Sequence, residues 1–207
     1  MTASRGRLIA LEGIDGCGKS TQARILADRL DAVATFEPGA TPLGASLRTL
    51  LLDRDGAAVS TRAEALLMAA DRAEHVDEVI VPALESGRWV VTDRYASSTL
   101  AYQGYGRGLD RGELDALVDW ATGGLRPDLT VLLDVPVDVA AHRRSGADDR
   151  MEGEGSAFQR RVAEGYLELA SEANGSWLVV DAAGPVESVA GVIWEAVCAL
   201  DGPDGPR

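Results

Sequence analysis

The sequence predicts a single α/β domain in which helices cover both faces of a five-stranded parallel sheet. Short apolar runs rich in β-branched residues alternate with longer amphipathic segments along the chain, which is typical of parallel strands joined by crossover helices. Pro42, Pro136 and Pro185 each lie where such a segment begins, a position at which a helix tolerates the missing N–H. A chain of 207 residues with 46% hydrophobic content can bury one large core. We therefore assign 1–200 to one domain and expect 201–207 to be a disordered tail.

The expected strands are the apolar runs, and the expected helices lie between them. The strands are Leu8–Leu11, Ala32–Phe36, Trp89–Thr92, Leu129–Leu133 and Trp177–Val180. The helices are Lys19–Leu30, Leu43–Leu52, Thr61–Glu85, Arg111–Ala121, Val137–Arg144, Ala157–Ala173 and Val186–Leu200. In a sheet covered on both faces, ligands gather at the carboxyl ends of the strands. We therefore look for functional residues directly after the strands.

The first expected strand leads into a glycine-rich loop of the form G-x-x-x-x-G-K-[ST], from Gly13 to Ser20. Glycines let backbone N–H groups surround phosphate oxygens, and the helix that begins at Lys19 points the positive end of its dipole at them. Lys19 is then expected to reach the β and γ phosphates, and the Ser20 hydroxyl to bind Mg²⁺. The loop therefore predicts a P-loop NTPase fold. Its candidate ATP-binding residues are Gly13, Asp15, Gly16, Cys17, Gly18, Lys19, Ser20 and Thr21.

A second signal is the acid and the base that follow the apolar run Trp89–Thr92, namely Asp93 and Arg94. A carboxylate at this point can hold the Mg²⁺ shell, and a guanidinium can bind a phosphate through two parallel hydrogen bonds. Asp134 closes another strand in the same way, but Pro136 follows at once, so we interpret Asp134 as a helix cap. Asp93 and Ser20 are therefore the predicted metal ligands.

The third signal is a charged, glycine-containing segment at 142–155 that carries Arg143, Arg144 and Arg150. A mobile arginine-bearing lid can close over a nucleotide, exclude water and neutralise charge on the phosphoryl group in transfer. The predicted catalytic residues are therefore Lys19, Asp93, Arg94, Arg143, Arg144 and Arg150.

Composition excludes several classes of partner. A net charge of −13 disfavours broad binding to nucleic acid or to an anionic membrane, which require a basic face. The two cysteines form no disulfide or metal-binding pattern, and the N-terminus has no apolar signal segment, so we expect a cytoplasmic protein. His75 and His142 carry no ligand or nucleophile pattern, and we interpret them as surface or helix residues.

Several longer stretches resemble those of thymidylate kinases, in the same order and at matching spacing. They read EGIDGCGKSTQ from Glu12, EPGATPLG from Glu37, ADRAEH from Ala70, DRYASSTLAYQG from Asp93 and DRME from Asp149. A following segment with Phe158 and Tyr166 extends the resemblance over nearly the whole chain. It implies an ATP-dependent kinase that converts dTMP to dTDP with Mg²⁺ and assembles as a homodimer.

The same resemblance implies which residues bind the phosphate of the acceptor nucleotide. Arg48 and Arg94 match positions that hold this phosphate, and Asp15 lies near the sugar and the phosphate. The loop lacks the basic residue that some relatives carry between its glycines. Relatives that lack this basic residue place their catalytic arginines in the lid, which agrees with the arginines found at 142–155.

Base recognition is implied by a second group. Arg72 matches a residue that bonds the pyrimidine carbonyl, Thr99 and Gln103 match residues at the base edge, and Tyr102 matches one packed beside the deoxyribose. The complete set of candidate acceptor-binding residues is Asp15, Glu37, Arg48, Met68, Arg72, Arg94, Ser98, Thr99, Tyr102 and Gln103.

Two positions depart from the family pattern. Met68 replaces a phenylalanine that stacks on thymine, and Phe36 replaces an arginine common before Glu-Pro-Gly. The alternatives to dTMP phosphorylation are therefore a kinase for another or a modified pyrimidine deoxynucleotide, and an inactive nucleotide-binding regulator.

Relatives also have a cis proline after the second strand, which makes Glu37–Pro38 a candidate cis peptide bond. The helix expected over Thr61–Glu85 carries the apolar residues Ala65, Leu66, Ala69, Val76, Val79 and Ile80, a surplus that would suit a dimer interface.

Overall fold

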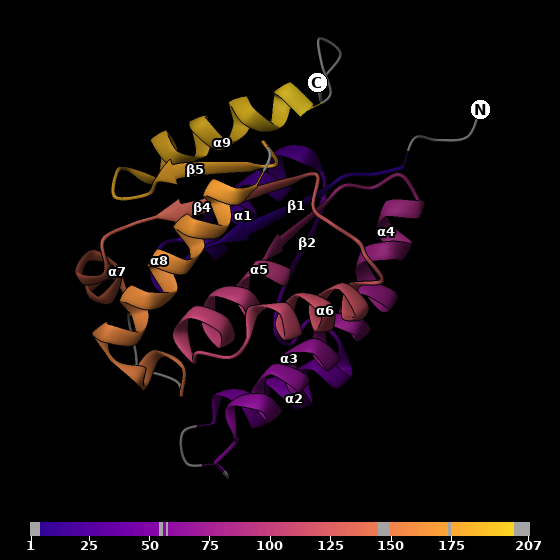
Figure 1. The fold of residues 1–207 in the computed structure, drawn as a ribbon. Coiled ribbons are helices and arrows are strands. Elements are labelled where there is room, and N and C mark those ends of the chain that lie inside the picture. Colours follow the sequence, from indigo (N-terminus) through magenta and orange to yellow (C-terminus); the bar gives the residue numbers. More distant parts are fainter. Residues whose placement is uncertain (1–4, 54–55, 57, 145–149, 174, 201–207) are drawn as a thin grey trace.

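The computed structural model describes residues 5–53, 56, 58–144, 150–173 and 175–200. In these residues five parallel strands form one sheet in the order β2-β3-β1-β4-β5 (Figure 1). The strands are β1 (Leu8–Glu12), β2 (Val33–Phe36), β3 (Val90–Asp93), β4 (Leu129–Asp134) and β5 (Trp177–Asp181). All five predicted strands and their parallel arrangement are confirmed.

Four strands extend one residue beyond their predicted ends, and each added residue is an acid. These residues are Glu12, Asp93, Asp134 and Asp181. The register pairs Leu11 of β1 with Asp93 of β3, and Asp134 of β4 with Asp181 of β5. The carboxyl edge of the sheet is therefore its polar edge, as expected for the edge that binds ligands.

Helices cover both faces of the sheet. Leu11 packs in a core cluster that includes Leu26 of α1 (Lys19–Leu30), whereas Ala10 packs in a second cluster with Ile80. Successive side chains of a strand point to opposite faces, so these clusters lie on the two sides of β1. In Figure 1, α1 and α9 lie together on one side of the sheet, and α3, α4 and α6 lie on the other.

Six of the seven predicted helices are present with small changes at their ends, and the seventh is divided into α3 and α4. They are α1, α2 (Pro42–Leu52), α3 (Thr61–His75), α4 (Val81–Glu85), α6 (Arg111–Thr122), α7 (Val137–Arg143), α8 (Ser156–Glu172) and α9 (Val186–Leu200). A short 3₁₀ turn, η3 (Glu152–Glu154), precedes α8.

Side chains cap several helix starts, but α1 begins differently. Thr41 Oγ1 accepts the N–H of Gly44 at 2.9 Å in α2, and the Asp110 carboxylate accepts the N–H of Glu113 at 2.9 Å in α6. Such caps satisfy N–H groups that have no partner within the helix. At α1 the cap is Gly18, which offers no side chain, and no described side chain caps it. The first N–H groups of α1 are thus left open to an anion.

The single helix expected over Thr61–Glu85 is wrong in detail. After α3, a π-helical turn η1 (Val76–Ile80) precedes α4. Pro82, in the first turn of α4, has no N–H, and its ring excludes a carbonyl group one turn earlier. The wider turn accommodates this proline, and the chain continues in the same direction.

A helical segment at 96–106 was not predicted. It consists of α5 (Ala96–Thr99) and the π-helical turn η2 (Leu100–Gly106). Serine, threonine and glycine give this stretch a low intrinsic helix propensity. Tertiary contacts hold it instead, since the buried Glu12 carboxylate accepts the N–H of Tyr95 at 3.0 Å and that of Ser98 at 3.1 Å.

Candidate active site

The phosphate loop connects β1 to α1 and is shaped by glycines with positive φ. Gly16 has φ 88°, and a Cβ atom there would lie 2.2 Å from the Ala140 carbonyl oxygen of α7. Gly13 has φ 141°, and its Cβ would lie 2.7 Å from the Leu133 carbonyl oxygen. Only glycine fits both the backbone conformation and the space at these two positions.

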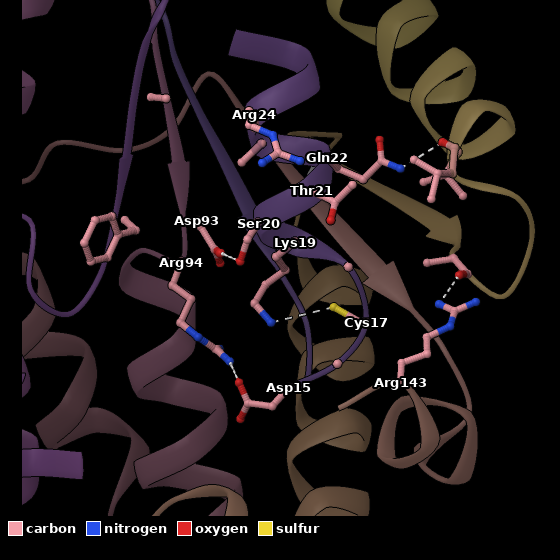
Figure 2. Close-up of a pocket in the computed structure, with 18 of the residues that line it drawn as sticks. Asp15, Cys17, Lys19, Ser20, Thr21, Gln22, Arg24, Asp93, Arg94 and Arg143 are labelled. Carbon is pink, nitrogen blue, oxygen red and sulfur yellow. Dashed lines mark hydrogen bonds and ion pairs between the residues drawn. The ribbon is translucent and has the colours of Figure 1, made fainter. Parts of the chain in front are cut away.

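Lys19 lies across the mouth of this loop. Its ammonium group donates to the Ile14 carbonyl at 2.9 Å and lies 3.7 Å from Cys17 Sγ (Figure 2). The side chain is 6% exposed, so the charge is held inside the loop. An ammonium group at this place, together with the uncapped N-terminus of α1, forms a site for phosphate oxygens.

A cleft of about 890 Å³ lies over the loop; we call it the donor cleft. Of the eight predicted ATP-binding residues, all but Gly13 line it. Its other end is lined by Ala182, Gly184, Pro185, Val186 and Val189, from the β5–α9 connection and the start of α9. A cleft with phosphate-binding groups at one end and a largely apolar wall at the other suits a nucleotide.

The predicted metal ligands lie together at the edge of this cleft. Ser20 donates its hydroxyl to Asp93 Oδ2 at 2.5 Å, while Asp93 Oδ1 is buried without a hydrogen-bond partner (Figure 2). A hydroxyl oxygen and an unsatisfied carboxylate oxygen fit Mg²⁺, which binds proteins through one or two such groups and completes its shell with phosphates and water. The described residues contain no group of three or more His, Cys, Asp or Glu side chains that could hold a metal ion.

Arg94 joins the donor cleft to the other half of the site. Its backbone is in the left-handed region with φ 73°, a conformation that costs a non-glycine residue about 1–3 kcal/mol. This turn directs the guanidinium into an ion pair with Asp15, whose other oxygen accepts the Tyr102 hydroxyl at 2.8 Å. Burial opposes ionisation of Asp15, but the Arg94 and Lys19 charges and the Tyr102 hydroxyl lower its pKa to about 2. Asp15 is therefore ionised at neutral pH.

A smaller cavity of about 90 Å³ lies beyond Arg94; we call it the acceptor cavity. All ten candidate acceptor-binding residues line it, although they come from the phosphate loop, the β2–α2 connection, α2, α3, the β3–α5 connection, α5 and η2. The spacing of these residues along the sequence did not predict that these elements meet at one cavity. The cavity shares Asp15, Glu37, Arg48 and Arg94 with the donor cleft, so the two spaces adjoin.

Arg72 is held rigidly in the wall of the acceptor cavity. It is 2% exposed, and it donates to Glu37 at 2.8 Å, to Thr99 Oγ1 at 2.7 Å and to the Tyr95 carbonyl at 3.0 Å. Glu37 precedes Pro38 through a cis peptide bond, which confirms the expectation for this position. A guanidinium fixed on several sides offers a well-oriented donor edge to a ligand.

Glu12 lines neither cavity but supports residues of the site. It was not among the site residues predicted from the sequence. It is fully buried, which raises its pKa, and it accepts hydrogen bonds from Ser98 Oγ at 2.6 Å and from the Tyr166 hydroxyl at 2.9 Å. Ser98 Oγ in turn accepts from Arg94 at 3.1 Å. The available signal was the acid at the end of an apolar strand, the same signal that identified Asp93.

Comparison with known proteins decides the family. The family model described as thymidylate kinase matches residues 11–193. The chain belongs to the thymidylate kinase family. It is similar to a thymidylate kinase of Synechococcus sp. (strain CC9902), with 54% identity over 200 residues that cover 91% of this chain and 95% of the relative. It is also similar to a thymidylate kinase of Cupriavidus necator, at 49% identity over 187 residues, 86% of this chain and 91% of the relative.

The predicted lid arginines lie in different places. Arg143 lines the donor cleft (Figure 2). It donates to the carbonyls of Ala182 at 2.7 Å and Ala183 at 2.9 Å. The aliphatic part of Arg144 packs beside Gly16 of the phosphate loop. Residues 145–149 of the predicted lid, like the predicted tail, lie outside the described residues.

Arg150 lies on the acceptor side instead. Its N–H donates to the Leu52 carbonyl at 3.2 Å, and its guanidinium lies 3.4 Å from Glu64. It lines neither the donor cleft nor the acceptor cavity in this arrangement. The catalytic role of the three lid arginines stays a prediction.

The two departures from the thymidylate kinase pattern lie in different spaces. Met68 lines the acceptor cavity, whereas Phe36 lines the donor cleft. The Phe36 ring is 45% exposed and lies under the guanidinium of Arg48, whose Cζ is 5.9 Å from the ring centroid. Arg48 also donates to the Pro38 carbonyl at 2.7 Å.

The structure corrects the interpretation of Asp134, and of the two alternatives given for His75 it confirms the helix and not the surface. Asp134 does not cap α7, whose N-cap is Pro136 with no side-chain hydrogen bond; Asp134 still belongs to β4, where its carbonyl accepts the N–H of Ala182 at 2.8 Å. His75 ends α3 but is not on the surface. It is fully buried, with Nδ1 2.9 Å from Glu37 and Nε2 2.7 Å from Thr35 Oγ1, and it supports the carboxylate that orients Arg72.

Proposed function

We propose that this member of the thymidylate kinase family transfers the γ-phosphoryl group of ATP to the phosphate of dTMP at the junction of the two cavities. The observation that carries the proposal is that Asp15, Glu37, Arg48 and Arg94 line both spaces. A donor phosphate chain on the loop would end where an acceptor phosphate meets two arginines. This arrangement suits direct transfer between two bound nucleotides.

The residues of the chain act by positioning and by charge stabilisation. Lys19 and the N-terminus of α1 hold the donor phosphates, and Arg94 and Arg48 hold the acceptor phosphate in line with them. Asp15 keeps Arg94 in place through their ion pair. The acceptor phosphate is already largely ionised near neutral pH, so no general base is required. The lid arginines would stabilise the charge that spreads over the transferred oxygens.

Ser20 and Asp93 would hold Mg²⁺ at the edge of the donor cleft, where their oxygens lie. When bound, the ion neutralises charge on the β and γ phosphates. Asp93 orients the Ser20 hydroxyl through its Oδ2 atom. Its other oxygen, the buried Oδ1, has no hydrogen-bond partner among the described residues.

A coupled ADP-release assay with an acceptor screen tests the proposal. We expect ATP-dependent turnover with dTMP, lower turnover with dUMP and little with dCMP. We also expect little turnover with the ribonucleotide TMP, because Tyr102 lies in the acceptor cavity beside the expected sugar position. A preference for a 5-substituted deoxyuridylate over dTMP would change the assigned acceptor. Absence of ADP release with every acceptor would contradict the proposal as a whole.

We also propose a homodimer that forms through α2, α3 and α6. The surplus expected for the helix over Thr61–Glu85 is largely absent, since Ala65, Ala69, Val76 and Ile80 are buried in the subunit's own core. The apolar side chains that remain exposed on these three helices are larger: Leu43 at 47%, Leu50 at 59%, Leu66 at 53% and Trp120 at 83%. Both α2 and α6 pack against α3 (Figure 1). A shared apolar face of this kind is typical of an interface between subunits.

The location in the cell is part of the proposal. Cys17 and Cys198 are both free, as expected in a reducing compartment, and we infer a cytoplasmic protein. No helix among the described residues is long and apolar enough to cross a membrane.

A further inference from the structure

A buried carboxylate outside both cavities connects the lid to the acceptor cavity. Glu64 of α3 is 1% exposed. Its Oε1 accepts from Gln103 at 3.0 Å and from Arg107 Nε at 3.1 Å, and its Oε2 accepts from Arg107 Nη2 at 3.0 Å and from Arg150 at 3.4 Å. One side chain therefore holds three partners from two separate parts of the chain, Gln103 and Arg107 at η2 and Arg150 in the lid.

These partners have different positions in the site. Gln103 lines the acceptor cavity, and Arg150 begins the part of the lid that returns to α8, which we call the lid return segment (150–154). Met151 of this segment also lines the acceptor cavity. Arg107, which binds Glu64, also contacts this segment directly through an ion pair with Glu154. Glu64 thus lies between the wall of the acceptor cavity and the lid.

The placement of Arg150 depends strongly on Glu64. Arg150 Nε and Nη1 are buried and have no hydrogen-bond partner, so Glu64 is the one described side chain that hydrogen-bonds this guanidinium. The Glu64 charge is balanced by two guanidinium groups, and removing that charge would leave Arg107 and Arg150 facing each other in a region shielded from water. Like charges held close in such a region repel strongly. The lid return segment would keep the Arg107–Glu154 ion pair and the hydrogen bond from the Arg150 N–H to the Leu52 carbonyl, but it would be held less firmly.

We infer that Glu64 is a positioning residue that couples occupation of the acceptor cavity to placement of the lid. Acceptor binding orders Gln103, Gln103 orders the Glu64 carboxylate, and Glu64 places Arg150. The inference rests on the proposed function, since it takes Gln103 as a contact of the acceptor and Arg150 as a lid arginine.

Glu64→Gln tests the coupling, because glutamine keeps the shape and one carbonyl acceptor but removes the charge. We expect the KM for dTMP to rise about tenfold, the size expected when one charged hydrogen-bond partner is lost, and the KM for ATP to change by less than about twofold. Loss of a merely structural contact would lower the fraction of folded enzyme without distinguishing the two substrates. Glu172→Gln is the matched control, since it removes an exposed ion pair with Arg111 and should leave both KM values unchanged.

Hydrogen exchange supplies a readout that needs no turnover. Peptides covering 150–154 are followed with and without saturating dTMP, and binding is verified by calorimetry. In the wild-type protein dTMP should slow exchange in this segment, and in Glu64→Gln bound dTMP should leave it unchanged. Equal protection in both proteins, or no protection in the wild type, would overturn the coupling.

The role of Arg150 is tested separately by Arg150→Ala in the ADP-release assay. A loss of kcat by about 10² or more, the scale of an arginine finger, would support the proposed lid chemistry. An unchanged kcat would remove that role, and the exchange experiment would still decide whether Glu64 couples the acceptor cavity to the lid. If Glu64→Gln does not fold, Arg107→Lys removes the planar guanidinium that binds the same carboxylate, and the same two outcomes apply.

Discussion

Asp71 places a second carboxylate beside Glu37 in the wall of the acceptor cavity. Its Oδ1 accepts the N–H of Gly39 at 2.9 Å. Burial, followed by repulsion from Glu37, raises the pKa of Asp71 from 3.8 to about 6. The folded protein therefore binds this proton more tightly than the unfolded chain does. The stabilisation from Asp71 is complete below the unfolded pKa and is lost as the pH rises through about 6.

Asp71→Asn should therefore stabilise the protein at alkaline pH and much less in acid. Asparagine keeps the acceptor for Gly39 and cannot ionise. We expect the Tm to rise by about a few degrees near pH 8 and to change little near pH 4.5, measured by thermal unfolding at the two pH values. A Tm gain that is equal at both would contradict the raised pKa.

Lys19 should be irreplaceable by arginine. A broad guanidinium does not fit the place where the compact ammonium group contacts Ile14 and Cys17. We expect Lys19→Arg and Lys19→Ala to lower kcat by about 10² or more, the scale of removing one preorganised donor, with the Tm nearly unchanged. The measurement is the ADP-release assay together with a thermal melt. A near wild-type kcat in Lys19→Arg would refute the role assigned to the loop.

Met68 offers a flexible thioether where an aromatic ring would stack on the base. A sulfur contact with a ring contributes about 0.3–1.5 kcal/mol, and an aromatic stack on a base about 1–3 kcal/mol. Met68→Phe should therefore lower the KM for dTMP several-fold with little change in kcat, because stacking stabilises ground and transition states about equally. Steady-state kinetics with dTMP decides this. A raised KM would mean that the cavity needs the space that methionine leaves.

At the scale of elements, the phosphate loop and α7 are packed against each other through Gly16. The close approach of Gly16 to the Ala140 carbonyl joins the loop that binds phosphates to the helix that leads into the lid. A side chain at Gly16 would push these two elements apart. Gly18 also has a positive φ, of 104°, but a Cβ atom there would meet no described atom within 4 Å.

Alanine substitutions at these two glycines separate the cost of backbone strain from the cost of a steric clash. Both Gly16→Ala and Gly18→Ala carry the cost of a left-handed alanine, about 1–2 kcal/mol, but only Gly16→Ala also meets the Ala140 carbonyl, 2.2 Å away. We expect Gly16→Ala to have the lower Tm and to lose ATP affinity measured by calorimetry. Equal Tm values for the two variants would show that α7 moves aside without cost.

At the scale of the whole molecule, the exposed apolar residues of α3 and α6 predict the oligomeric state. Leu66→Asp combined with Trp120→Asp should convert a dimer to a folded monomer, because both side chains are exposed in the subunit and would be buried in the dimer. Leu167→Asp on α8, exposed to 42%, is the matched control and should leave the mass unchanged. Light scattering at micromolar concentration gives the mass, and a monomeric wild type would contradict the interface.

The sequence by itself determined the strands, most helix boundaries, the phosphate loop and the acid at the end of β3. These features depend on neighbours within one element: apolar periodicity, a proline at a helix start, or a glycine pattern between a strand and a helix. The segment at 96–106 escaped this reasoning because its residues have little helical preference of their own. It folds on contacts with β1, far away in the chain.

Only the tertiary structure decided which distant side chains bind each buried carboxylate. Tyr166 reaches Glu12 across 154 positions, Arg150 reaches Glu64 across 86, and Arg72 reaches Glu37 across 35. No local period relates such residues, and Glu37 and Glu64 taken alone resemble solvated surface groups. Buried ions must find compensating charges and hydrogen bonds wherever the packed elements place them. The sequence therefore determined the phosphate-binding chemistry, and the packing of α3, η2 and the lid return segment against one another decided how the acceptor side is held.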